Sequence, residues 1–213
     1  MGRWRSVEIF DLRAEEYDRW YEEHLGLYLS ELKAVREFTC KKAIEIGIGT
    51  GRFAYGTGVI VGVDPSLKML RQAPKNVNLV QAVGERLPFR DHSFDCAFLI
   101  VTLCFVENPL KVLEESARVA ERVIVCIIPR ESSWGKYYMK LAEKGHPIYS
   151  LARFYSVQEV IELASKIGLH LRRIIATIKS LPGREERVEE PKSADPREAE
   201  RYGFVCMEFS RKL

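Results

Sequence analysis

The sequence predicts an α/β fold: a doubly wound, mostly parallel sheet with a C-terminal antiparallel strand and an N-terminal helical extension. In the middle of the chain, short β-rich apolar runs alternate with helical stretches, and such alternation indicates βαβ units. Residues 96–101 are apolar without interruption, as in a central strand that is buried on both faces. Near the C-terminus, runs 169–179 and 203–210 are joined without a crossover helix, so they should pair antiparallel.

The N-terminal segment is expected to be helical. Residues 8–38 carry apolar side chains at three- and four-residue spacings, which is the period of a helix with one buried face. We expect a break near Gly26 to divide this helix into two pieces. The apolar positions are Phe10, Tyr17, Trp20, Tyr21, Leu25 and Leu29.

Strands and helices then alternate as far as residue 167. The expected strands are 43–46, 59–63, 78–83, 94–101 and 122–128. The expected helices are 66–73, 109–119 and 156–167. The connection from Pro182 to Arg201 is highly charged and shows no helix with an apolar face.

The chain length favours one domain. A sequence of 213 residues can bury one substantial core and is short for two. We therefore expect a single domain, residues 1–213. Its parts are a helical N-terminal cap (1–40), a cofactor-binding core (41–130), a substrate cap (131–155), and a C-terminal helix and strand pair (156–213).

Composition and charge limit the classes of molecule that the protein is expected to bind. The chain is 46% hydrophobic and 30% charged, and no apolar run reaches the ~20 residues of a membrane-spanning helix. The N-terminus lacks the apolar core of a secretory signal, so a cytoplasmic protein without a membrane partner is expected. A net charge of +3 with interspersed signs disfavours nucleic acid and leaves a small molecule or a protein side chain as substrate. The sequence does not indicate an oligomeric state.

The content of Asn, Gln and Cys bears on the kind of source organism and on whether the protein binds a metal. Six Asn and Gln residues stand against 33 basic and 30 acidic ones, which is a pattern of thermophilic proteins, and there disulfides can persist in the cytosol. The cysteines show no metal-binding spacing, so no metal site is expected. They are Cys40, Cys96, Cys104, Cys126 and Cys206.

A glycine-rich turn follows the first expected strand. In the run Glu45–Gly51, glycines alternate at 47, 49 and 51, and they let the backbone approach a ligand closely. Glu45 would face a positively charged ligand group such as an amino group or a sulfonium. Asp64 ends the next strand, where a carboxylate can accept both hydroxyls of a ribose or cap the following helix.

A dinucleotide-binding turn is the alternative. That pattern, Gly-x-Gly-x-x-Gly, requires glycine where this sequence has Arg52. Arg52 would crowd the helix–strand approach that the third glycine permits. The turn therefore favours a sulfonium cofactor over a dehydrogenase.

The motifs in order resemble those of class I S-adenosylmethionine-dependent methyltransferases. They run from residue 9 to 167 and include 14–20 in the leading helix, the glycine turn at 45–51, Gly62-Val63-Asp64-Pro65-Ser66, 84–89 and 93–95. The closest likeness is to the small-molecule group typified by the ubiquinone/menaquinone biosynthesis enzymes. The resemblance implies a Rossmann-like seven-stranded sheet and S-adenosylmethionine as cofactor, with S-adenosylhomocysteine as product and no metal.

The resemblance also implies roles for ten residues. Three glycines, Gly47, Gly49 and Gly51, would line the methionine end of the cofactor beside Glu45. Asp64 would hold the ribose, Met69 would pack near the adenine, and Gly84 and Glu85 would lie along the adenine edge. Thr102 would lie under the cofactor, and Tyr17 would close over the site from the leading helix.

Three departures from the family pattern concern adenine recognition and local shape. Val83 stands where the family often has an Asp that accepts from the adenine amino group. The first helix is clipped, because few residues separate Gly51 from Asp64. Residues 119–122 replace the usual Pro-Gly-Gly turn before the fifth strand.

Acceptor-facing residues should follow the fourth and fifth strands, because ligands of this fold bind at the carboxyl ends of the strands. The substrate-binding candidates are Phe105, Trp134, Tyr137 and Tyr138, of which the last three belong to an aromatic segment at 131–155. This segment is either a lid over an apolar or cationic substrate or a helix packed on the domain. Cys104 is expected to line the pocket rather than to act as a nucleophile.

No catalytic residue is assigned. Methyl transfer is an in-line displacement that depends on positioning, and a base is needed only if the nucleophile must lose a proton. The candidate bases are Glu107, His146 and His24. The leading hypothesis is a methyltransferase for a small-molecule acceptor. The alternatives are a cofactor-binding, non-catalytic regulator or partner protein, and a nucleic-acid or protein methyltransferase.

Overall fold

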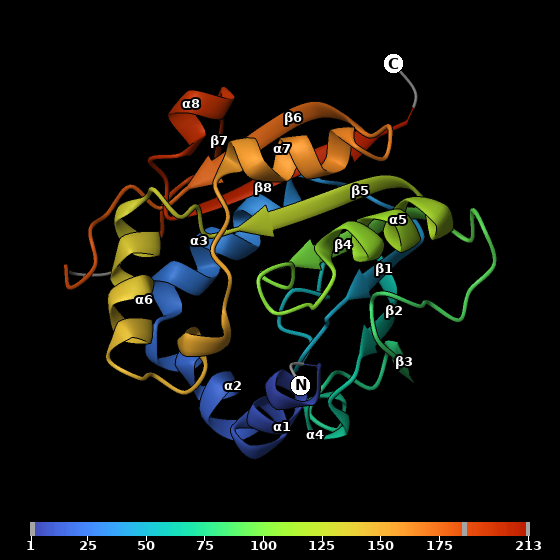
Figure 1. Ribbon diagram of the computed structural model, residues 1–213, viewed down its shortest axis with the longest axis horizontal. Helices are drawn as coiled ribbons and strands as arrows, with labels where there is room; N and C mark the ends of the chain where they lie inside the picture. The colour runs from blue at the N-terminus through green and yellow to red at the C-terminus, as the bar shows by residue number, and fades with distance from the viewer. Residues whose placement is uncertain (1–2, 185–186, 212–213) are drawn as a thin grey trace.

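One eight-stranded sheet runs through the computed structural model, which describes residues 3–184 and 187–211 (Figure 1). Its strands are β1 (Ala43–Ile46), β2 (Val59–Asp64), β3 (Asn78–Gln81), β4 (Phe94–Ile100), β5 (Ala120–Ile127), β6 (His170–Thr177), β7 (Lys192–Ser193) and β8 (Phe204–Ser210). The spatial order is β3-β2-β1-β4-β5-β8-β6-β7. Strands β1 to β5 pair parallel, and β8 runs antiparallel between β5 and β6.

This arrangement confirms the predicted Rossmann-like sheet and its C-terminal antiparallel strand. The eighth strand, β7, was not expected. It lies in the charged connection between 182 and 201, where two residues pair with the outer edge of β6. Only two residues extend the ladder, so no apolar alternation marks this strand in the sequence.

The helices lie on both faces of the sheet (Figure 1). They are α1 (Arg3–Leu12), α2 (Ala14–Glu23), α3 (Leu25–Arg36), α4 (Leu67–Leu70), α5 (Pro109–Val119), α6 (Ser133–Glu143), α7 (Val157–Ser165) and α8 (Pro196–Ala199). Alternate residues of β4 serve the two cores: Ala97 and Leu99 join the core under α5 and α7, whereas Phe98 joins the core under α3 and α6.

The N-terminal segment differs from the expectation of two helices that break near Gly26. It forms three helices, and the breaks fall at Arg13 and His24, whose φ angles are −121° and −119°. Gly26 lies in the first turn of α3, where its carbonyl accepts a hydrogen bond from the Ser30 hydroxyl at 2.7 Å. The apolar spacing alone did not separate α1 from α2, because only Arg13 divides the two helices.

Two of the local departures noted in the sequence have structural counterparts. The connection from Gly47 to Gly58 contains no helix. Gly58 has φ +78°, and a Cβ there would lie 2.0 Å from the Cys40 carbonyl oxygen, so this turn requires glycine. Helix α5 ends at Val119 and β5 begins at Ala120, so no loop remains for a Pro-Gly-Gly turn.

Two disulfides cross the core under α3. Cys40 is bonded to Cys96, and Cys126 on β5 is bonded to Cys206, the residue that faces it on β8. Cys104 is the one free cysteine of the five. The structure thus contains the disulfides that the thermophile-like composition allowed.

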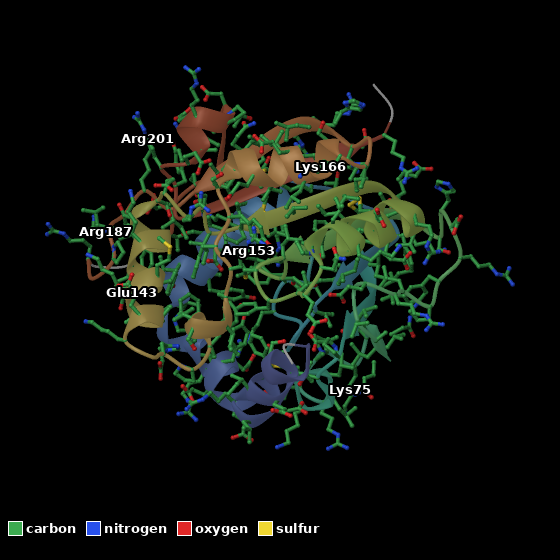
Figure 2. All side chains as sticks on the ribbon, in the orientation of Figure 1. Lys75, Glu143, Arg153, Lys166, Arg187 and Arg201 are labelled. Carbon is green, nitrogen blue, oxygen red and sulfur yellow. A yellow bond between two sulfur atoms is a disulfide. The ribbon has the colours of Figure 1, made fainter. Side chains whose placement is uncertain are left out.

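Charged side chains gather at the periphery, as those of Lys75, Glu143 and Arg201 show (Figure 2). Within the described ranges, no helix is long and apolar enough to cross a membrane.

Candidate functional site

A cavity of about 600 Å³ opens at the carboxyl ends of β1, β2 and β4. Strand ends contribute Gly47, Asp64 and Thr102, and α1 contributes Val7 and Phe10 from the opposite side. This volume includes the opening of the cavity to solvent. We call this space the cofactor cavity.

The glycine turn shapes one wall of the cofactor cavity. Gly47 and Gly49 line it with φ of +74° and +54°, and a Cβ on Gly47 would lie 2.4 Å from Thr102 Cγ2. A Cβ on Gly49 would meet nothing within 4 Å, which leaves its backbone open to a ligand. Gly51 does not line the cavity, since its α-carbon faces Pro74 instead.

Glu45 lies beneath the turn and is 2% exposed. Its Oε2 atom is buried without a hydrogen-bond partner, although it lines a small hollow with Gly47 and Gly49. Burial, and then the charge of Asp64, raise its pKa to about 8. An unsatisfied buried carboxylate is costly, and a ligand amino group in this hollow would satisfy it.

Asp64 ends β2 at the middle of the cavity. Its Oδ2 accepts from the Gly49 N–H at 2.9 Å and its Oδ1 from the Ser66 N–H at 2.8 Å. Each oxygen keeps one acceptor site for a ligand hydroxyl. Burial raises the pKa of Asp64 to about 6, against the two backbone donors. Asp64 thus bonds the turn that follows β2, whereas the N-cap of α4 is Ser66, whose hydroxyl accepts from the Met69 N–H at 3.1 Å. A ligand-binding role for Asp64 stays a prediction.

A side hollow continues from the cavity along the end of β3. Gly84 and Glu85 line it together with Val83, and Glu85 accepts from the Asn108 N–H at 3.3 Å. Met69, 2% exposed, forms part of the cavity wall near Asp64. Val83 offers no side-chain acceptor, but Glu85 and Glu107 line the same hollow and offer carboxylates beside its backbone groups and apolar contacts.

The chain is strained where β4 ends. Val101 has φ +50°, a conformation that is rare for a β-branched residue and costs about 1–3 kcal/mol. It contacts the cofactor cavity on one side and a second space on the other. The next residue, Thr102, donates from its hydroxyl to the Ile100 carbonyl at 3.1 Å.

The second space, which we call the aromatic hollow, adjoins the cofactor cavity at Tyr17, Val101 and Phe105. Its volume is about 840 Å³ including its opening to solvent. Its other lining residues are Glu16, Trp20, Tyr21, Glu23, Glu31, Ile128, Tyr138, His146, Ile148 and Tyr149. A ligand there would lie next to one in the cofactor cavity.

Two ring contacts and one hydrogen bond hold the shared wall. The Phe10 ring packs edge-on against Tyr17 at 5.5 Å and against Phe105 at 5.0 Å, centroid to centroid. The Tyr17 and Tyr21 hydroxyls lie 3.0 Å apart. Burial raises the pKa of Tyr17, so it remains a neutral phenol. Tyr17 thus lies over the cavity, as the resemblance implied.

The acceptor candidates divide into two groups. Phe105 and Tyr138 line the aromatic hollow, whereas Trp134 and Tyr137 do not. Trp134 is 9% exposed and its indole N–H donates to the Ser180 carbonyl at 2.8 Å, so it packs α6 on the domain. Tyr137 is 41% exposed.

The three candidate bases are also separated. His146 lines the aromatic hollow, and burial lowers its pKa. Glu107 lines the side hollow near Gly84, away from the shared wall. His24 stacks on Trp20 at 4.7 Å and lies outside both spaces.

Sequence reasoning missed Glu31 and assigned no role in the site to Tyr149. Glu31 lies on the buried face of α3, four residues from both Leu27 and Val35, which are also buried. A carboxylate at helical spacing among apolar residues was the signal that could have identified it. Cys104 lines a small hollow with Tyr149, and burial raises its thiol pKa to about 12, so a thiolate nucleophile is not favoured.

Comparisons with known proteins agree with this geometry. A family model described as a methyltransferase domain matches residues 44–126. An uncharacterised protein of Methanocaldococcus jannaschii is 40% identical over 177 residues, 81% of this chain and 86% of that protein. An uncharacterised protein of Mycobacterium tuberculosis is 35% identical over 179 residues, which are 80% of this chain and 63% of that protein.

Two solved structures extend the comparison. A Thermotoga maritima protein, described as an S-adenosylmethionine-dependent methyltransferase and possible histamine N-methyltransferase, is 35% identical with a TM-score of 0.89, and the match covers 97% of this chain and 100% of that one. Magnesium protoporphyrin IX methyltransferase of Synechocystis with bound S-adenosylhomocysteine has a TM-score of 0.65 at 13% identity, covering 98% and 100%. The second match shows the fold alone.

Proposed function

Because the chain belongs to the family of S-adenosylmethionine-dependent methyltransferases, we propose that it methylates a small-molecule acceptor bound in the aromatic hollow. The observation that carries the proposal is the contact between the two spaces at Tyr17, Val101 and Phe105. A methyl donor in one space and an acceptor in the other would meet at this shared wall.

The cofactor cavity suits the donor at both ends. The unpartnered Oε2 of Glu45 fits the amino group of the methionine part, and the free acceptor sites of Asp64 fit the ribose hydroxyls. The Gly49 backbone leaves open space between them. In the side hollow, Gly84 and Val83 provide a narrow, largely apolar slot for a flat ring such as adenine.

S-adenosylmethionine supplies a methyl group on a positively charged sulfur. The chain has to hold the acceptor in line with that methyl group, about 3 Å from it, and to exclude water. Phe10, Tyr17 and Phe105 are packed edge to face at the shared wall, which supports both tasks. Catalysis by positioning does not require a base near the wall.

The side chains that line the aromatic hollow support a small acceptor. Polymers require an open groove, and a nucleic acid also requires a basic face. None of the described residues that line the aromatic hollow is a lysine or an arginine.

Isothermal titration with S-adenosylhomocysteine tests the cofactor half of this proposal. We expect binding to the wild type and a loss of at least about tenfold in affinity for Asp64→Asn, because one charged acceptor is removed. Asp91→Asn is the matched control, since Asp91 is exposed and pairs with Arg118. Equal affinity in all three proteins, or no binding at all, would contradict the proposed site.

A further inference from the structure

The acidic side chains that line the aromatic hollow are not balanced by basic ones. Three carboxylates line it, Glu16, Glu23 and Glu31, and within the described ranges no lysine or arginine does. Glu16 pairs with Arg13 outside the lining. Glu23 is exposed at the opening, whereas Glu31 is 6% exposed. The interior of the hollow therefore carries a potential negative charge without a lining cation.

Glu31 is buried without a polar partner. No hydrogen bond or ion pair joins its carboxylate to another residue in the described part of the chain. Burial alone raises its pKa to about 8, so the empty protein holds much of it protonated at neutral pH. Burial of an ionisable group is unfavourable unless it is paired, and here the unpaired side chain lines a ligand-sized space.

Tyr21, Tyr138 and Tyr149 line the same hollow as this carboxylate. Burial raises the pKa of Tyr21, Tyr138 and Tyr149, and the Glu31 charge contributes to each increase. The Tyr138 and Tyr149 rings lie 4.4 Å apart, beside α3. Faces of aromatic rings attract cations, and phenols that stay neutral at physiological pH add no competing charge.

The remaining titratable group of the hollow does not supply a cation either. Burial lowers the pKa of His146, which keeps its imidazole neutral at physiological pH. Its Nδ1 accepts from the backbone N–H groups of Ile148 and Tyr149 at 3.3 and 3.4 Å. The ring is thereby fixed as an acceptor toward its own loop.

We propose that the acceptor is a compact amine that binds as a cation, with its ammonium group against the Glu31 carboxylate and between the rings of Tyr21, Tyr138 and Tyr149. This inference rests on the proposed function and adds the substrate class. Glu31 acts as an anchor and specificity residue. A nitrogen held as an ammonium has no lone pair, so it is not the attacking atom while it keeps its proton.

The same arrangement rejects anions. A carboxylate or phosphate in the hollow would face Glu31 in a low-dielectric space, where like charges repel strongly. A neutral molecule would leave Glu31 protonated and would gain only apolar contacts. A cation gains both the ion pair and the ring contacts, and it offsets the cost of ionising Glu31.

The test uses the full chain saturated with S-adenosylhomocysteine. Isothermal titration compares benzylamine, 2-phenylethylamine and 3-phenylpropylamine with the neutral 2-phenylethanol and the anionic 3-phenylpropanoate. We expect at least one amine to bind roughly 10- to 150-fold more tightly than the alcohol, the range of a hydrogen bond to a charged group. The anion should bind more weakly than the alcohol.

Two variants locate the effect at Glu31. Glu31→Gln should remove the preference for the amine over the alcohol, and its affinity for the alcohol should stay within about threefold, which shows that the hollow is intact. Glu23→Gln, at the exposed opening, should keep most of the preference, because an exposed charge contributes little.

The outcomes separate this inference from the proposed function. Saturable S-adenosylhomocysteine binding together with equal affinity for amine and alcohol, or an unchanged preference in Glu31→Gln, overturns the inference alone. The same holds if no amine binds at about 10 mM, a concentration that detects very weak binding. A chain that does not bind S-adenosylhomocysteine contradicts the proposed function itself.

Discussion

Arg52 donates from Nε to Oδ1 of Asp18 at 2.7 Å and joins the glycine turn to α2. The same guanidinium reaches Glu22 one turn further along α2, at 3.0 Å. Burial raises the pKa of Asp18, but the hydrogen bonds from Arg52 and Thr50, together with the charge of Arg52, outweigh burial and lower it. The ion pair thus anchors α2, the helix that carries Tyr17, to the glycine turn.

We therefore expect Arg52→Gln to weaken S-adenosylhomocysteine binding, because Arg52 both anchors α2 and lines the small hollow beside Glu45. The loss should be about tenfold, because a half-buried charged hydrogen-bond network is broken. Arg201→Gln, at an exposed position, is the control and should bind normally. Titration calorimetry on both variants checks this. Unchanged affinity for S-adenosylhomocysteine in Arg52→Gln would show that the Arg52–Asp18 contact does not contribute to cofactor binding.

Glu45→Gln should change affinity and stability in opposite directions. Its carboxylate is unpartnered and its pKa is raised to about 8, so the ionised form destabilises the empty protein. The variant should melt at a higher temperature than wild type at pH 9 and should bind S-adenosylhomocysteine at least about tenfold more weakly. If Glu45 were merely structural, the variant would lose stability and keep its affinity.

Glu31 should produce a pH-dependent stability that disappears on substitution. Burial raises the pKa of Glu31 in the folded protein to about 8, above the 4.5 of an ordinary glutamate. Between these two pH values the folded state therefore binds one proton more than the unfolded state. The stability linked to this proton is complete below pH 4.5 and is lost as the pH rises through 8. Thermal melts of wild type and Glu31→Gln should therefore diverge from pH 5 to pH 9, with the variant more stable at pH 9.

If the melting temperatures of the two proteins changed with pH in the same way over that range, a buried, unpaired Glu31 would be contradicted. The neighbouring phenols do not disturb the comparison, because the raised pKa values of Tyr17, Tyr21, Tyr138 and Tyr149 lie above the range. His146 titrates equally in both proteins, so the difference between the curves isolates Glu31.

The two disulfides determine how many thiols can react in the denatured protein, and they contribute to the free energy of unfolding. Denatured, non-reduced protein should react with a thiol reagent at one cysteine, Cys104. Cys40 and Cys96 are 56 residues apart, and a loop of this size corresponds to about 4 kcal/mol in the chain-entropy model. Cys40→Ser/Cys96→Ser should therefore lower the free energy of unfolding by a few kcal/mol, as measured by guanidinium titration, whereas more than one reactive thiol would contradict the pairing.

The sequence was most informative where backbone geometry restricts residue choice. The glycine turn and Asp64 were recognisable because positive φ angles and a strand-end carboxylate leave a local pattern. The parallel pairing of β1 to β5 followed from the alternation of strands and helices. These features lie within short segments, so one sequence was enough to predict them.

Features that depend on packing between distant segments could not be predicted in the same way. The spacing of Glu31 with Leu27 and Val35 could have indicated a buried carboxylate, but not that it lines a hollow with residues of α2 and α6. Trp134 does not line that hollow, and its indole N–H donates to the Ser180 carbonyl, far along the chain. The breaks at Arg13 and His24 leave the apolar spacing nearly intact, which is why Gly26 was the more visible candidate.

A methyl-transfer assay tests the proposed function most directly. Purified chain would be incubated with S-adenosylmethionine labelled in its methyl group and with separate panels of amines, phenols, thiols and carboxylic acids. We expect label in an acceptor that carries an ammonium group in addition to the methylated atom, and a loss of at least about tenfold in kcat/KM for Glu31→Gln. Saturable cofactor binding without transfer to any panel would instead indicate a non-catalytic, cofactor-binding protein.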